Sequence, residues 1–217
     1  MQITLIEARD LPEAWFLCLR RLFEAGRVYE IDRGSYVGTR RMEFDFVVVN
    51  IAEPGREPII PVGLPAGIPA PTSMDYVESY LPYLMTAHKA EKEQYTYGQY
   101  LEGQIAEVIR MYREDGYNTN QGYMAVGDAH SLFLSDPPCL RGIDTRVRDG
   151  KLHFAVYFRS WDLWAGFPSN LAALQLLKRY MADEIGLEDG SMVACSKGLH
   201  LYEYAWDLAK SYAMPDT

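Results

Sequence analysis

The spacing of apolar residues along the chain predicts alternating helices, strands and loops. Leu11–Glu24 places Trp15 and Leu19 on one face of a helix. The run Phe44–Ile51 is rich in valine and is typical of a buried strand. Prolines and glycines crowd the segment from Glu53 to Pro71, so we expect a loop there.

The middle of the chain predicts two more helices and a strand. Ser73 and Asp75 are N-cap residue types, so a helix should run from them to about Met85. Gln99–Tyr112 repeats apolar residues at helical spacing, and Gly122–Val126 has the pattern of a strand.

A tight hairpin is expected further along. Asp149-Gly150 is a turn dipeptide that favours two-residue hairpin loops. We therefore expect Gly142–Arg148 to pair with Leu152–Arg159.

The last third should contain a buried helix. Pro168 opens Ser169–Ile185, whose apolar residues surround most of the helix. A short strand, Ser191–Cys195, and a final helix, Leu201–Ser211, follow. The expected class is α+β: one domain over residues 1–217, with a mixed, mostly antiparallel sheet packed against the long buried central helix.

Composition narrows the class of protein. The net charge of -9 argues against general nucleic-acid binding and against an anionic membrane surface. No apolar run approaches the ~18 residues of a membrane span, and the N-terminus lacks a signal-peptide core. The three cysteines have no CxxC spacing, which disfavours disulfides and a zinc site. We expect a cytoplasmic protein with no metal.

One cysteine lies in a setting that suits a nucleophile. Pro137 and Pro138 fix the backbone immediately before Cys139, so the thiol is held on a stiff corner. A fixed attack geometry removes orientational entropy before the reaction, and a nearby cation would increase the thiolate fraction. The alternative is an inert loop cysteine, and these residues alone leave both readings open.

Three more clusters have the residue types of a ligand site, each with a plain structural alternative. Arg159 and Ser160 follow a strand and suit a phosphate, or Arg159 pairs with Asp162 at the surface. The carboxamide of Asn170 matches N3–H and O4 of uracil, or it only caps its helix. His200 and Tyr202 point to one side of an extended segment and suit a ribose hydroxyl, or they are an ordinary packed pair.

The order of these clusters resembles that of the thymidylate synthase family, from about Gln104 through Tyr202. A Pro-Pro-Cys, an Arg-Ser-x-Asp, a Pro-x-Asn and a His-x-Tyr follow one another in that family. Arg159, Asn170 and His200 come 20, 31 and 61 residues after Cys139, which matches the family spacing without a gap.

The resemblance implies a role for each residue. Cys139 would attack C6 of the pyrimidine, with Glu78 and Tyr97 as further catalytic residues. Arg33, Arg159 and Ser160 would bind the 5′-phosphate, Asn170 the base, and His200 and Tyr202 the deoxyribose. Asp162 and Gly166 would lie near the pterin. The match is looser upstream, where Arg33 follows Asp32, Tyr97 precedes Gly98, and Glu78 has a poor motif.

Three departures from the family pattern point to its short, archaeal, methanogen-type branch. Leu140 stands where the family has a histidine, and no arginine stands at 119–121, where the partner subunit's phosphate ligands are expected. The phosphate site would be rebuilt from Arg33, Arg40, Arg41 or Arg141. We also expect no counterpart, after Tyr202, of the segment that closes over the folate in the family.

The function implied is C5 methylation of dUMP in a homodimer. The carbon donor would be 5,10-methylenetetrahydrofolate or a modified archaeal methylene-tetrahydropterin. Two alternatives stay open: a hydroxymethylase acting on dUMP or dCMP, and a non-catalytic nucleotide- or RNA-binding regulator. The intact Cys139 and the acidic charge balance argue against the regulator.

Overall fold

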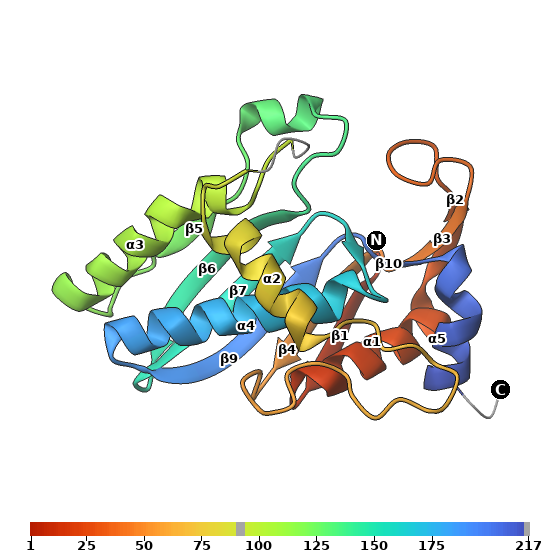
Figure 1. The fold of residues 1–217 in the computed structure, drawn as a ribbon, viewed down its shortest axis with the longest axis horizontal. Coiled ribbons are helices and arrows are strands. Elements are labelled where there is room, and N and C mark those ends of the chain that lie inside the picture. Colours follow the sequence, from red (N-terminus) through yellow and green to blue (C-terminus); the bar gives the residue numbers. More distant parts are fainter. Residues whose placement is uncertain (90–93, 215–217) are drawn as a thin grey trace.

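The computed structural model describes residues 1–89 and 94–214, whose strands form two sheets (Figure 1). The larger sheet has six strands, in the spatial order β1 (Ile3–Ala8), β4 (Phe46–Ile51), β9 (Glu188–Ser196), β7 (Lys151–Phe158), β6 (Leu140–Arg148) and β5 (Tyr123–Ala125). The pairs β1–β4 and β7–β9 are parallel, and the others are antiparallel. The predicted combination of helices with a mixed sheet is confirmed.

The smaller sheet joins segments that are far apart in sequence. Its order is β2 (Arg27–Glu30), β3 (Arg40–Glu43), β10 (Leu199–Tyr202) and β8 (Trp161–Asp162). In this register, His200 pairs with Glu43 on one side and with Asp162 on the other. The sheet therefore brings three titratable residues from three regions of the chain side by side.

Helices cover one face of the larger sheet. The helices are α1 (Leu11–Ala25), α2 (Met74–Met85), α3 (Gly98–Glu114), α4 (Gly166–Ile185) and α5 (Trp206–Ala213). α4 contacts β7 and β9 and lies beside α1 and α3, while α2 packs over α3 and α4 (Figure 1). α4 has 20 residues and buries 13 of them, so it fills the space between the sheet and the outer helix.

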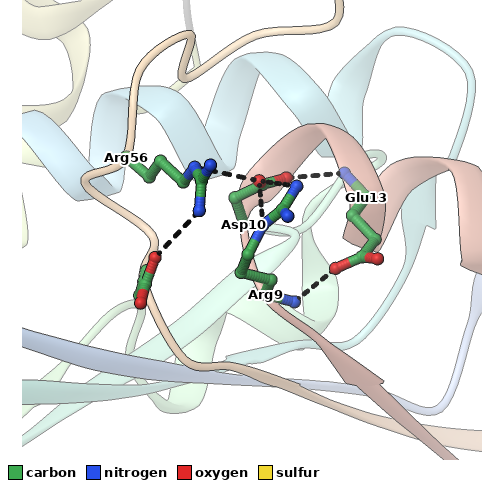
Figure 2. Close-up of polar contacts among 5 residues, drawn as sticks. Arg9, Asp10, Glu13 and Arg56 are labelled. Atoms are coloured by element: carbon green, nitrogen blue, oxygen red, sulfur yellow. Dashed lines mark hydrogen bonds and ion pairs between the residues drawn. The ribbon is translucent and has the colours of Figure 1, made fainter.

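The N-terminus of α1 is fixed by charged side chains, as Figure 2 shows. Asp10 caps the helix by accepting a hydrogen bond from the amide of Glu13 at 3.0 Å. Glu13 in turn accepts from the amide of Arg9 at 2.6 Å. Arg9 and Arg56 both approach the Asp10 carboxylate, at 2.9 and 3.9 Å. Arg56 thereby ties the proline-rich loop to this helix end.

The predicted hairpin is present. Residues 148 and 151 pair across the turn, and Asp149 and Gly150 have φ angles of 51° and 73°. Two consecutive positive φ angles define the turn that suits the twist of an antiparallel pair. The hairpin places the start of β6 beside the end of β7.

The prediction of a helix over Leu201–Ser211 was wrong in its first half. Leu201 is fully buried in β10, and α5 begins only at Trp206. Its neighbours β3 and β8 supply the hydrogen-bond ladder that holds this segment extended. Strands β1, β2 and β3 were not predicted, and β2 is exposed along its whole length, so it lacks an alternating pattern.

Candidate active site

A cavity of about 500 Å³ opens where both sheets end. Its wall combines the β2–β3 loop, the segment before β6, the β7–β8 turn and the β9–β10 turn. Seven of the residues to which the family resemblance assigns a role line it: Arg33, Cys139, Arg159, Ser160, Asp162, His200 and Tyr202. Its volume lies within the ~300–1,000 Å³ of sites that bind small molecules.

Arg159 holds the loop that carries Cys139. The amide of Arg159 donates to the carbonyl of Cys139 at 2.8 Å, and its Nε donates to the carbonyl of Pro138 at 3.2 Å. Its Nη2 donates to the carbonyl of Pro137 and lies 3.2 Å from the carboxylate of Asp136. The alternative of an Arg159–Asp162 ion pair was therefore wrong, because Asp136 is the partner of this guanidinium.

The Cys139 thiol is partly buried, which separates it from the fully buried Cys18. Burial raises the pKa of Cys139, since a thiolate is poorly solvated there. The positive charge of Arg159 opposes this shift, and the negative charge of Asp136 adds to it. The thiolate fraction thus depends first on burial and then on the balance between these two charged neighbours.

Removing the charge of Asp136 should increase the reactivity of the thiol. In Asp136→Asn, we expect the pKa of Cys139 to fall, because a repulsive charge is lost and Arg159 loses a competing partner. Alkylation by iodoacetamide at pH 7 should then be several-fold faster, and the pH midpoint of alkylation should move down. The control is Asp144→Asn, which removes an exposed carboxylate that is not among the described residues lining the cavity. An unchanged or higher midpoint in Asp136→Asn would contradict this electrostatic account.

Asp162 lines the cavity and also caps α4. Its carboxylate accepts from the amides of Trp164, Ala165 and Gly166 at 3.3, 2.9 and 3.1 Å. This explains why α4 begins at Gly166, before Pro168, which fits within the first turn. The hydroxyl of Ser169, in the same turn, donates to the carbonyl of Ala165 at 2.7 Å.

Asn170 lies in the second turn of α4 and does not cap the helix. Its Oδ1 accepts a hydrogen bond from the indole Nε1 of Trp161 at 2.9 Å. Trp161 lines the cavity, whereas Asn170 and Gly166 are not among the described residues that do. The structure thus places the half-buried Asn170 carboxamide next to a residue of the cavity wall.

His200 presents an unused ring nitrogen. Its Nδ1 donates to the carbonyl of Gly198 at 2.8 Å, and Nε2 is buried with no hydrogen-bond partner among the described residues. Burial lowers the pKa of His200 to about 4, so the ring is neutral and Nε2 is an acceptor. The Tyr202 ring lies 4.6 Å from the His200 ring, on the same side of β10.

The two remaining predicted residues, Tyr97 and Glu78, are not among the described residues that line the cavity. The Tyr97 hydroxyl is buried and accepts from the amide of Leu140 at 3.3 Å, next to Cys139. Burial and the proximity of Cys139 raise the pKa of Tyr97, which keeps its phenol neutral. Glu78 is exposed on α2 and is not among the described residues that line the cavity.

Sequence reasoning missed several residues of the cavity wall. Glu43 and Lys197 both line the cavity, and neither was predicted from the sequence. Arg33 and Arg41 are the two of the four suggested replacement arginines that line the cavity, whereas Arg40 pairs with Glu203. The carboxylate of Glu43 forms an ion pair with Arg41 at 3.1 Å and accepts a hydrogen bond from the hydroxyl of Tyr29 at 2.9 Å. The alternation of Arg41 and Glu43 in the sequence was the pattern that could have predicted a strand with charged residues on one face.

Neither a metal centre nor a membrane span emerges from the residues described. Among residues 1–89 and 94–214, no three histidine, cysteine or acidic side chains gather as metal ligands would. No described helix combines the length and the apolar character needed to cross a membrane.

A thiol, several cationic groups and a neutral histidine around one cavity define the kind of site that binds an anionic small molecule beside a nucleophile. The chain belongs to the thymidylate synthase family, whose model, described as "Thymidylate synthase", matches residues 86–213. The family resemblance expected from the motifs is confirmed.

Similar proteins come from methanogens. Proteins named "Putative thymidylate synthase" from Methanosarcina mazei and Methanothermobacter thermautotrophicus are 28% and 26% identical to this chain. The alignments cover 95% and 91% of this chain, and 93% of each relative. A "Thymidylate synthase" from Symbiobacterium thermophilum is 38% identical, over 38% of this chain and 28% of its own. The resemblance to the methanogen branch is thus confirmed.

Proposed function

We propose that this protein is a thymidylate synthase that methylates C5 of dUMP to give dTMP through a covalent bond between Cys139 and C6. The observation that carries the proposal is the convergence of Cys139, Arg159, Ser160, His200 and Tyr202 on one cavity. These residues lie up to 63 positions apart in the sequence, and all of them belong to the motifs that resemble those of the thymidylate synthase family.

The phosphate of dUMP is assigned to the cationic side of the cavity. Arg33, Arg159 and Ser160 are its proposed ligands, and Arg41 and Lys197 add positive charge to the cavity lining. Within the described part of the chain, neither Arg33 nor Lys197 has an ion-pair partner. Two free cations beside Arg159 favour a dianionic group.

The nucleoside is assigned to the part of the cavity lined by His200 and Tyr202. The buried acceptor Nε2 of His200 suits a deoxyribose hydroxyl as donor, with Tyr202 beside it. Asn170 recognises the pyrimidine edge, since its carboxamide offers an acceptor for N3–H and a donor for O4.

Chemistry at this site starts from the thiolate. The Cys139 sulfur bonds to C6, and the C5–C6 π electrons move into an enolate at C4. Asn170 stabilises the enolate oxygen by donating to it. C5 then attacks the one-carbon unit, a base removes the C5 proton, and the enolate expels the nitrogen of the donor, which leaves an exocyclic methylene on C5. Addition of hydride to this methylene gives the enolate again, and loss of the sulfur from C6 then restores the ring double bond. Glu78 is the proposed base for the proton step, with a water between it and C5, and the neutral Tyr97 hydroxyl is proposed to orient that water.

The carbon donor is a reduced methylene-pterin, either 5,10-methylenetetrahydrofolate or a modified archaeal tetrahydropterin. When bound, it supplies the one-carbon unit and, for a methyl product, the hydride. Leu132 lines the cavity and is 73% exposed, and its neighbour Phe133 is 82% exposed. Exposed apolar side chains at a cavity mouth fit a flat ring system. Asp162 and Gly166 are the proposed polar neighbours of the pterin.

A homodimer is proposed together with this activity. The sheet face opposite the helices carries partly exposed Phe46, Val48, Tyr157 and Val193, and Ile3 on edge strand β1 is 69% exposed. An apolar sheet face of this kind fits an interface with a second copy. The three cysteines are free thiols, which accords with the reducing cytoplasm proposed as the location.

The test is release of tritium from C5-labelled dUMP with each methylene-pterin. We expect release with one of them, none with deoxyuridine, which lacks the phosphate, and a product with the mass of dTMP. A hydroxymethyl product would show that the protein is a hydroxymethylase and not a thymidylate synthase. Binding of dUMP without release of tritium, whichever carbon donor is added, would show that the protein is a nucleotide-binding regulator and not an enzyme.

A further inference from the structure

Trp161 is held rigidly at the cavity wall. Its ring stacks on Phe158, with the centroids 3.9 Å apart and the planes 8° from parallel, and it contacts Phe167 at 4.6 Å. Only 3% of the residue is exposed. This packing requires a flat ring but not an N–H group, so the hydrogen bond of the indole needs a separate explanation.

The indole fixes the orientation of the Asn170 carboxamide. Its Nε1–H is only a donor, so the atom that faces it at 2.9 Å must be the amide oxygen. A rotation of the amide by 180° would replace this hydrogen bond by two opposed donors. Leaving a buried donor unpaired costs on the order of 1–3 kcal/mol, so the rotated amide is strongly disfavoured.

This orientation decides which pyrimidine the amide can match. Oδ1 keeps a second lone pair after accepting from Trp161, and Nδ2 keeps its two hydrogens. The pair offers an acceptor for N3–H and a donor for O4, which is the pattern of uracil. Cytosine presents the reverse pattern, an acceptor at N3 and a donor at the 4-amino group, and needs the rotated amide.

We propose that Trp161 is a positioning residue that makes this site select a 4-oxo over a 4-amino pyrimidine by locking the Asn170 amide. The inference rests on the proposed function, in which Asn170 recognises the edge of the base. Trp161 acts through Asn170 and takes no part in the bond changes.

The first test is Trp161→Phe, which keeps the aromatic stack and removes the N–H. We expect the ratio of dUMP to dCMP affinities, measured by calorimetry, to fall by at least ~10-fold, mainly through tighter binding of dCMP. Trp206→Phe is the matched control, because it loses an indole bond to the carbonyl of Leu201 at 3.1 Å, outside the described cavity wall. In Trp206→Phe, the ratio of dUMP to dCMP affinities should equal that of the wild type.

The second test separates orientation from a general disturbance of the cavity. An aspartate carboxylate has no donor end, so Trp161→Phe should change the affinity ratio less than ~2-fold in the Asn170→Asp background. An equal fall in both backgrounds would overturn the inference.

The remaining outcomes separate this inference from the proposed function. A wild-type preference for dUMP that persists in Trp161→Phe overturns the inference alone, whereas a wild type indifferent to the two bases overturns both. Should Trp161→Phe fail to fold, hydrogen exchange of the indole N–H gives the answer. Its exchange should be faster in Asn170→Ala, and an unchanged rate would show that the contact does not exist.

Discussion

Replacing Cys139 by alanine is expected to abolish tritium release from C5-labelled dUMP. C5 of uracil becomes nucleophilic only after a sulfur adds at C6, and Cys139 is the cysteine that lines the cavity. Removal of a covalent nucleophile lowers turnover by a factor of ~10⁴ or more. Binding of dUMP should stay within a few-fold of the wild type, because the proposed phosphate and ribose ligands remain.

Cys195→Ala is the matched control for this variant. Cys195 is also a free and partly exposed thiol with a raised pKa, but it lies on the face of the larger sheet opposite the helices, and it is not among the described residues that line the cavity. Its loss should leave tritium release close to that of the wild type. Turnover retained in Cys139→Ala would refute the assignment of the nucleophile and the covalent mechanism with it.

The proximity of Cys139 and Arg159 follows from a local signal. The Asp149-Gly150 turn fixes the register of β6 and β7, and counting back from it places Cys139 opposite the segment that begins at Arg159. A bulge near Leu140 shifts the pairing by one residue, which the sequence does not reveal. The hydrogen bond from Arg159 to Cys139 nevertheless joins the two residues that the motifs connected.

The opposite wall of the cavity was not predictable in the same way. Arg41 and Glu43 reach the site because β3 pairs with β10, about 160 residues later in the chain. Short exposed strands have weak hydrophobic alternation, and their pairing depends on long-range contacts. The helix predicted from Leu201 failed for the same reason, since β3 and β8 hold that segment extended.

Asn170→Asp is expected to reverse the preference between uracil and cytosine nucleotides. The carboxylate loses the N–H that would donate to O4 and places a negative charge against that oxygen. A lost partner costs about 1–3 kcal/mol, and more when a charge is involved, so kcat/KM for dUMP should fall ~10²-fold. For dCMP, the 4-amino group can donate to the carboxylate, and kcat/KM should rise.

The surroundings of Asn170 make this variant a fair test. The indole of Trp161 can donate to a carboxylate oxygen as it does to the amide oxygen, so the aspartate keeps its anchor at the cavity wall. Asn170→Ala is the control, because it removes all contacts to the base edge and should weaken both nucleotides without reversing their order. Tritium release from C5-labelled dUMP and dCMP, compared across the three proteins, measures this directly. An undiminished preference for uracil in Asn170→Asp would mean that another group recognises the base, and both the edge-recognition role of Asn170 and the positioning role of Trp161 would then fall.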